Sequence, residues 1–368
     1  MGFRCGVVGL PNVGKSTLFN AITGNSVPAE NYPFCTVDPN TGVVPVPDSR
    51  LDALVALLSP DKWTPSVLEF IDIAGLVKGA SNGEGLGNQF LSHIREVDVI
   101  AHVVRCFSDP NVAHVSGAVD PAGDAKTVQT ELLLKDLDTL RKRRDKIINH
   151  ARSGEKAYKD ELEIVDRFVA HADGGTALRS AVKTDSERRI SAELGLLTTK
   201  PAFFVANVGE ARPPEEEAAL RALKTHAAAE GTGLLEIRAR FEAELLGLGP
   251  DDRAAFMADA GMKETGLDAL VREGYRLLDI ITFYTTVGTE IRAWTVPRGT
   301  RAVDAAGKIH TDMAKGFVKA ECIRAEDLLA CGSEKEARAN GKGTVEGKDY
   351  VVRDGDVLHI RFTPAAAR

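Results

Sequence analysis

Residues 9–17 read GLPNVGKST, and this stretch decides the fold. It fits G-x-x-x-x-G-K-[ST], the P-loop pattern, at every fixed position. Residues 3–8 are apolar enough for a buried strand, and residues 18–22 suit a helix. Because a P-loop needs a strand before it and a helix after it, these flanks predict an α/β domain built around a phosphate-binding turn.

The residue types of the loop explain how it would hold a nucleotide. Glycines let successive backbone N–H groups point inward as an anion nest, and the following helix adds the positive end of its dipole. Lys15 supplies a mobile charge for the β- and γ-phosphates, and the Ser16 hydroxyl is placed to bind Mg²⁺. An ordinary glycine-containing turn is the alternative, which the flanks disfavour. The predicted nucleotide contacts in the loop are Asn12, Val13, Gly14, Lys15, Ser16 and Thr17.

Length and composition limit the class of protein. With 368 residues, 43% of them hydrophobic and 27% charged, the chain has room for two or three domains and the composition of a soluble globular protein. No apolar run is long enough to cross a membrane, and we expect no signal peptide. Five scattered cysteines without metal-ligand spacing indicate reduced thiols and a cytoplasmic location. The net charge of −7 argues against a surface that coats nucleic acid, but leaves a local basic patch open.

Two further motifs point to Mg²⁺ and the γ-phosphate. Thr36 lies in the first loop after the P-loop helix, where P-loop switch proteins place a threonine that binds Mg²⁺; a solvated or turn-capping threonine is the alternative. The tetrapeptide DIAG follows an apolar run, so Asp72 would support Mg²⁺ through water and Gly75 would bring its N–H to the γ-phosphate. The predicted metal-binding residues are therefore Ser16, Thr36 and Asp72.

The group that orients the attacking water is less obvious. Many switch proteins carry Gln directly after D-x-x-G, but this chain has Leu76, whose side chain forms no hydrogen bonds. Residues 76–87 are glycine-rich, which predicts a loop ordered by nucleotide; a flexible linker is the alternative. His114 lies in a later loop and could handle the water or its proton, although such a histidine is often structural. We expect Lys15, Gly75 and His114 to be the catalytic residues.

Another motif concerns the base. Residues 207–210 read NVGE after an apolar run, at the place where guanine-specific switch proteins carry N-K-x-D. The Asp carboxylate of those proteins accepts from guanine, a pairing that Val208 and the longer Glu210 do not reproduce. The motif therefore disfavours strict guanine selection and makes adenine plausible through Asn207 and nearby backbone. Residues 237–242 give a weak signal for a further base-contacting loop.

Residues 126–199 have helical periodicity. Apolar residues recur at spacings of three and four on both sides of RSGE at 152–155, which predicts two antiparallel helices in a coiled-coil hairpin. Because a strand pattern returns afterwards, the segment is an insertion within the α/β domain. Its cluster RKRR at 141–144 is either a solvated helix face or a contact with RNA or the ribosome.

The pattern changes again at about residue 278. We expect paired strands at 280–285 and 290–296, a helix at 302–314, and strands at 350–352 and 357–362 joined by an Asp-Gly turn. This segment holds no catalytic constellation, so we interpret it as a small β-rich binding module.

The motifs at 9–17, 31–36, 72–80 and 207–210 together closely resemble those of the YchF-type Obg-like ATPases, within the P-loop translation-factor-related GTPases. Residues 292–295 and 347–350, with Gly355 and Asp356, resemble the TGS domain, a β-grasp fold. The resemblance covers nearly the whole chain. It implies an OBG-type P-loop nucleotide-binding domain over 1–277 with a helical coiled-coil insertion at 126–199, and a TGS domain over 278–365.

The resemblance also implies a function. It implies slow, Mg²⁺-dependent hydrolysis of ATP in preference to GTP, association with the ribosome or a ribosomal subunit, and a role in translation or stress regulation. Leu76 matches a hydrophobic residue that replaces the catalytic Gln, and His114 matches a loop histidine that could act instead. In one departure, Arg238 and Ala239 stand where the family has a small Ser-Ala pair.

The leading hypothesis is an ATP-hydrolysing switch in which nucleotide orders the chain around Thr36 and 76–90 and alters the cleft between coiled coil and TGS domain. A second class is an RNA- or ribosome-binding module in which nucleotide is mainly a structural ligand. Salt-sensitive ribosome association that ignores the nucleotide state would favour it. A guanine-specific GTPase is a third option, which Glu210 disfavours.

Overall fold

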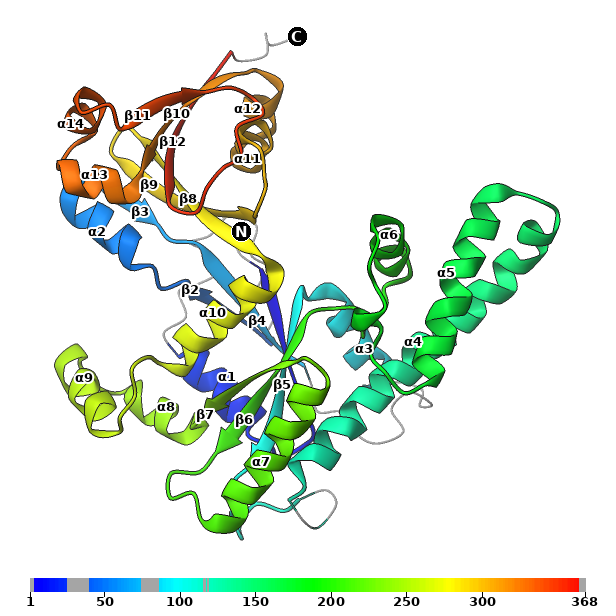
Figure 1. Ribbon diagram of the computed structural model, residues 1–368. Coiled ribbons are helices and arrows are strands. Elements are labelled where there is room, and N and C mark those ends of the chain that lie inside the picture. The colour runs from blue at the N-terminus through cyan, green and yellow to red at the C-terminus, as the bar shows by residue number, and fades with distance from the viewer. Residues whose placement is uncertain (1–2, 25–39, 74–85, 115–116, 118, 364–368) are drawn as a thin grey trace.

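The structure is a computed structural model that describes residues 3–24, 40–73, 86–114, 117 and 119–363. The strands of this part of the chain form two six-stranded sheets. The helical hairpin extends to one side of the first sheet, and the second sheet lies on the other side (Figure 1). No helix of the described ranges is long and apolar enough to cross a membrane.

The first sheet has the strand order β2-β4-β1-β5-β6-β7 and is parallel except for β2. Its strands are β1 (Arg4–Val8), β2 (Thr41–Pro45), β4 (Val67–Asp72), β5 (Val99–Cys106), β6 (Ala202–Val208) and β7 (Gly233–Ile237). Every residue of β5 is buried, as a central parallel strand requires. Since ligands of open parallel sheets bind beyond the carboxyl ends of the strands, the ends of β1, β4 and β6 mark the site.

Helices cover both faces of this sheet. They are α1 (Lys15–Thr23), α3 (Leu86–Glu96), the first turns of α4 (Pro121–Arg152), α7 (Pro214–Ala229), α8 (Ala239–Leu245) and α10 (Gly266–Leu278). Helix α9 (Pro250–Asp259) lies off to the side, beyond α8 (Figure 1). Alternate residues of β6 enter different cores. Phe203 belongs to the core that α1, α3 and α10 share, whereas Phe204 packs with Leu220 and Leu223 of α7.

The helical hairpin has the predicted turn. α4 ends at Arg152 and α5 (Lys156–Asp173) follows directly. α4 begins at Pro121, where the Asp120 side chain accepts the N–H of Gly123 and caps the helix. Leu137 and Leu140 of α4 are buried with Val165 and Phe168 of α5, which confirms the apolar seam. A short 3-10 helix (Leu178–Ser180) and α6 (Asp185–Leu194) lead back to the sheet.

The second sheet has the order β11-β10-β12-β8-β9-β3. Its strands are β3 (Lys62–Thr64), β8 (Ile280–Val287), β9 (Glu290–Pro297), β10 (Phe317–Arg324), β11 (Gly343–Glu346) and β12 (Asp356–Phe362). Its helices are α11 (Ala302–Ile309), α12 (Thr311–Lys315), α13 (Ala325–Cys331) and α14 (Glu334–Ala339). The expected β8–β9 pairing is confirmed. The expected single helix at 302–314 is two helices, because the backbone of His310 is extended.

The expected pairing of 350–352 with 357–362 is wrong. Val351 forms only an isolated bridge to Arg301, and β12 pairs with β10 and β8 instead. The buried Asp356 carboxylate accepts from the backbone N–H of Arg353 and from the Tyr350 hydroxyl, at 2.8 Å each. These side-chain bonds fix the turn, so no strand pairing is needed.

An early segment of the chain belongs in space to the second sheet (Figure 1). β3 pairs in parallel with β9, and Leu54 of α2 (Ser49–Leu58) packs in one core with Tyr284 and Ile291. The Tyr284 hydroxyl also donates to Asp48 at 2.5 Å. The division of the chain at residue 278 stays a prediction, and this segment reaches across it.

Candidate nucleotide-binding site

The P-loop connects the end of β1 to the start of α1, as predicted. Asn12 and Gly14 have left-handed backbone conformations, with φ of 63° and 91°. A Cβ on Gly14 would lie 2.2 Å from Asn207 Nδ2, so glycine is required there on both grounds. The curled backbone turns its N–H groups toward the space in front of α1.

Lys15 is held inside the loop. Its Nζ donates to the carbonyls of Gly9 at 3.1 Å and Leu10 at 2.9 Å, and the residue is 8% exposed. Burial lowers the pKa of Lys15, and the nearby Asp72 carboxylate partly opposes this shift. The ammonium group of Lys15 is therefore bound to two carbonyl oxygens of the loop, and phosphate oxygens can replace these as its acceptors.

The residues predicted for Mg²⁺ meet in part. Ser16 Oγ lies 3.5 Å from Oδ2 of Asp72 at the end of β4. Asp72 Oδ1 is buried and has no hydrogen-bond partner in the described ranges, and burial raises the pKa of this carboxyl. A buried oxygen without a partner beside a hydroxyl fits a hard divalent cation or its water. Thr36 and Gly75, like Leu76, lie outside the described residues.

A cavity of about 680 Å³ opens beside the P-loop at the carboxyl end of β6. Gly14, Thr17, Asn207, Val208 and Glu210 all line it, so it brings together the phosphate loop and the predicted base motif. Its size suits a nucleoside.

Asn207 has a structural part as well as a place in this cavity. Its Nδ2 donates to the Val13 carbonyl at 3.0 Å, and its Oδ1 accepts from the Ala239 N–H at 3.2 Å. The side chain thus ties the P-loop to the start of α8. Arg238 and Arg240 line the same cavity, although Arg238 also donates to the Ala260 carbonyl at 3.1 Å.

Sequence reasoning missed two residues that shape the cavity wall. The buried Arg105 donates to the carbonyls of Phe107, Asp109 and Val112 at 3.1, 3.3 and 3.0 Å. Glu216 Oε1 accepts from the Ser108 N–H at 2.6 Å. In the sequence, a charged Arg105 within the apolar run of β5 is the feature that could have indicated a functional role. Nothing in the sequence singles out Glu216.

His114 follows this wall and is joined to both the P-loop and α4. Asn12 Nδ2 donates to the carbonyl of Ala113 at 3.1 Å. His114 Nε2 lies 2.9 Å from Asp124 Oδ2, and both side chains are buried. Burial raises the pKa of Asp124, against the bond from His114. The carboxylate therefore fixes the orientation of the imidazole, and Asp124 is a partner that the sequence did not reveal.

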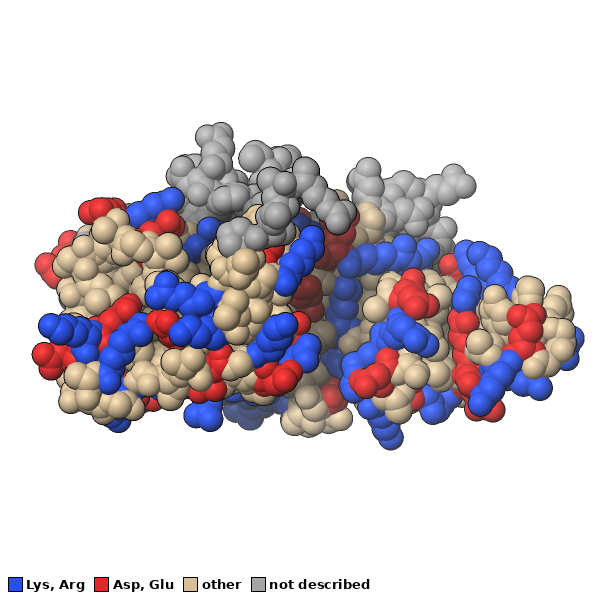
Figure 2. Space-filling model, turned by 90° about the horizontal axis from the view of Figure 1, so that it is seen from above, with Lys and Arg blue, Asp and Glu red and all other residues tan. Residues whose placement is uncertain are grey.

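The basic cluster at 141–144 is paired within the hairpin. Arg143 contacts Glu161 at 2.6 Å and Arg144 contacts Asp166 at 2.5 Å, both across the two helices. The cluster's other pairs are Arg141 with Asp173 and Lys142 with Asp138. Basic and acidic side chains lie intermixed over the face seen in Figure 2. The hairpin therefore presents mixed charge rather than a basic patch.

Comparisons with known proteins agree with this geometry. A family model described as 50S ribosome-binding GTPase matches residues 4–149, and one for the YchF GTPase C-terminal region, described as a protein of unknown function, matches 280–363. The chain is 47% identical over 362 residues to the ribosome-binding ATPase YchF of Shigella flexneri, covering 98% of this chain and 99% of that protein. It is 46% identical over 364 residues to that of Bacillus subtilis, covering 98% and 100%. The solved YchF GTPase of Schizosaccharomyces pombe is 36% identical with a TM-score of 0.86, and 98% of each chain is covered.

Proposed function

This chain belongs to the YchF family, and on that premise we propose that it is a Mg²⁺-dependent, ATP-hydrolysing switch that works on the ribosome. One observation carries the nucleotide part of the proposal. The P-loop, with Lys15 held inside it, opens into the same cavity as the end of β6. Phosphates and base of one nucleotide can therefore be bound together.

The base motif supports ATP. Glu210 lines the cavity where a guanine-specific protein would place a shorter aspartate, and Val208 replaces the lysine. Asn207 is held by Val13 and Ala239, so it presents one fixed edge of its amide to a base. Relatives carry both names, ATPase in Bacillus subtilis and GTPase in Schizosaccharomyces pombe, so selectivity is the property to measure first.

The residues divide the work of hydrolysis. Lys15 moves from two carbonyls to phosphate oxygens, and the P-loop N–H groups hold the phosphate chain. Ser16 and Asp72, with Thr36, would hold Mg²⁺, which supplies charge neutralisation when bound. His114, oriented by Asp124, positions the water or takes its proton, and the Gly75 N–H is assigned to the γ-phosphate.

The proposed partner is the ribosome, since the relatives are named ribosome-binding ATPases. A cytoplasmic location is part of the same proposal, because it would bring the protein together with the ribosome. Contact with RNA through the coiled coil and the TGS domain is the finer part of the proposal. The basic residues at 141–144 are paired with acidic side chains. Their contact with RNA would therefore depend on the shape of the hairpin and on replacing these carboxylates by phosphates of the RNA.

Parallel equilibrium titrations with ATP and GTP in the presence of Mg²⁺ test the proposal. We expect tighter binding of ATP, and loss of both nucleotides in Lys15→Ala, because the charge-assisted bonds to phosphate disappear. Lys62→Ala is the control, since that exposed lysine lies on β3 in the second sheet. Tighter GTP binding would make the chain a GTPase, and unchanged binding in Lys15→Ala would refute the site.

A further inference from the structure

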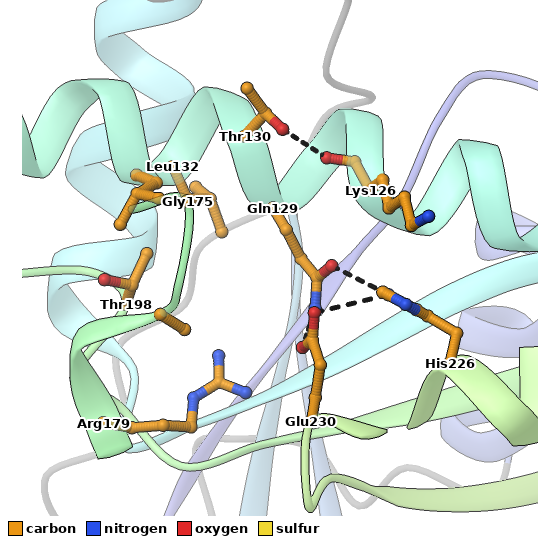
Figure 3. Close-up of a pocket in the computed structure, with 11 residues that line it drawn as sticks. Lys126, Gln129, Thr130, Leu132, Gly175, Arg179, Thr198, His226 and Glu230 are labelled. Carbon is orange, nitrogen blue, oxygen red and sulfur yellow. Dashed lines mark hydrogen bonds and ion pairs between the residues drawn. The ribbon is translucent and has the colours of Figure 1, made fainter. Parts of the chain in front are cut away.

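A second cavity of about 240 Å³ lies at the root of the helical hairpin, lined by α4, the 3-10 helix and the carboxyl-terminal end of α7 (Figure 3). None of its lining residues lines the nucleotide cavity. We propose that it is a separate binding site for a free phosphate-class oxyanion, bound through Arg179.

The guanidinium of Arg179 has few partners within the described ranges. Its Nε is fully buried and makes no hydrogen bond within the described ranges, and Nη1 has only a long contact of 3.4 Å to Thr232 Oγ1. In that same part of the chain, no carboxylate lies within salt-bridge distance of it. Burial lowers the pKa of Arg179, which Glu230 partly opposes. A guanidinium carries five N–H donors and is strongly disfavoured when buried without acceptors.

Hydrogen bonds to Thr198 fix the backbone at Arg179. Its backbone N–H donates to the Thr198 carbonyl at 3.0 Å, and the Leu178 N–H donates to Thr198 Oγ1 at 3.2 Å. Thr198 is in turn held by the buried Asp136, which accepts its N–H at 2.8 Å and its hydroxyl at 2.6 Å. The arginine therefore stands on a rigid base, and its side chain reaches into the cavity (Figure 3).

The polar side chains of the opposite wall, Gln129, His226 and Glu230, contact one another. Gln129 Nε2 donates to Glu230 Oε2 at 2.5 Å, and His226 Nε2 lies 3.1 Å from Gln129 Oε1 and 3.4 Å from Glu230 Oε1 (Figure 3). Glu230 thus has two partners that are not Arg179. Lys126 also lines the cavity, but it is exposed and its amine points away from Arg179 (Figure 3), so Arg179 is the cation that faces the space.

The chemistry of the site selects the ligand. A planar fork of N–H donors is suited to oxygen pairs of phosphate, and the cavity volume lies below the range of about 300–1,000 Å³ in which larger ligands bind. A free inorganic phosphate with its water fits this space. An ion there would join the root of the hairpin to α7. The first turn of α4, one of the two hairpin helices, carries Asp124, the partner of His114.

Calorimetric titration with inorganic phosphate tests the site. The full chain is first saturated with Mg²⁺ and a non-hydrolysable ATP analogue, so that the P-loop is filled, and sodium chloride of matched ionic strength is the reference. We expect one saturable site. Arg179→Gln should weaken phosphate binding by about tenfold or more, because bonds to a charged group are lost. Glu230→Gln should tighten it, because a repelling charge is removed.

Arg188→Gln is the matched control, since this arginine on α6 is exposed and paired with Asp185. It should bind phosphate like the unaltered chain. The absence of saturable binding would overturn the proposal, and so would equal affinity in Arg179→Gln. If Arg179→Gln fails to fold, Glu230→Gln decides: unchanged or weaker phosphate binding would overturn the proposal, because removal of a carboxylate from the wall of the cavity should strengthen the binding of an anion inside it.

Discussion

The contact between His114 and Asp124 bears directly on the proposal that His114 acts on the attacking water in place of a glutamine. At 2.9 Å, the carboxylate holds one ring nitrogen and stabilises the positive charge that proton transfer would leave on the imidazole. In the structure the side chain of His114 is buried together with that of Asp124. The Asn12 contact to Ala113 places the loop that holds His114 beside the P-loop.

Removing the imidazole should therefore slow chemistry and spare binding. We expect His114→Ala to lower the single-turnover rate of ATP hydrolysis by about 10²-fold or more, the usual size of general acid–base effects. Asp124→Asn should give a smaller loss, because the imidazole stays but loses its orienting charge. Rapid-quench measurements with saturating ATP check both rates, and calorimetry checks affinity.

His150→Ala is the control, because that exposed histidine lies at the hairpin turn, where its ring contacts Glu155 and Tyr158 of the hairpin itself. Normal turnover in His114→Ala would show that the histidine is structural. If both Asp124→Asn and His114→Ala bind ATP poorly, the pair instead shapes the site.

Single positions in the P-loop could be predicted because local spacing dictates their chemistry. Lys15 and Gly14 stand where the pattern requires them. Asp124 and Glu216 could not be predicted, since each finds its partner through the fold. Glu216 meets Ser108 across 108 residues of sequence, and no local pattern encodes such a contact.

At the scale of elements, the helical hairpin shows why a charge run is ambiguous in sequence. Arg143 and Arg144 look like a basic patch when α4 is read alone. Glu161 and Asp166 lie on α5 and neutralise them only once the hairpin forms. The apolar seam was predictable because its period is local, whereas the pairing across the helices depends on their register.

Glu321 joins three elements of the second sheet, and its charge should matter for stability. It lies on β10 and contacts Arg338 of α14 at 2.9 Å and Arg361 of β12 at 3.3 Å. These bonds lower the pKa of Glu321 from 4.5 to about 2. Because the folded pKa is depressed, the carboxylate stabilises the fold above pH 4.5, and this contribution is lost as the pH falls toward 2.

We therefore expect Glu321→Gln to destabilise the second sheet by about 1 kcal/mol at pH 7, allowing for solvent screening, and to have little effect near pH 2. Both tryptophans of the chain, Trp63 and Trp294, lie in this sheet, so urea midpoints from tryptophan fluorescence report on it directly. Glu326→Gln is the control, since that side chain is 76% exposed. A difference that does not depend on pH would contradict a role for the charge.

At the scale of the molecule, the nucleotide-binding part and the C-terminal part share one segment. The order of helices and strands was largely predictable from periodicity and turns. The place of α2 and β3 was not, because β3 has only three residues and is mostly exposed. Besides the bond from Tyr284 to Asp48, Arg50 contacts both Asp48 and Asp354, the latter at 2.7 Å. β2 leads into this segment from the stretch that holds Thr36. A change at Thr36 thus has a short covalent path to the second sheet.

Leu54 tests whether this segment is part of the C-terminal unit. Its side chain is fully buried in the core that contains Tyr284 and Ile291. We expect Leu54→Ala to destabilise the second sheet by about 2–5 kcal/mol through the cavity it leaves. Tryptophan fluorescence should then show unfolding at lower urea, while ATP affinity stays unchanged. Leu134→Ala, at a position that is 45% exposed on α4, should change neither measurement. Loss of ATP affinity with an unshifted fluorescence midpoint would instead assign α2 to the nucleotide-binding domain, and the boundary near residue 278 would hold for the whole chain.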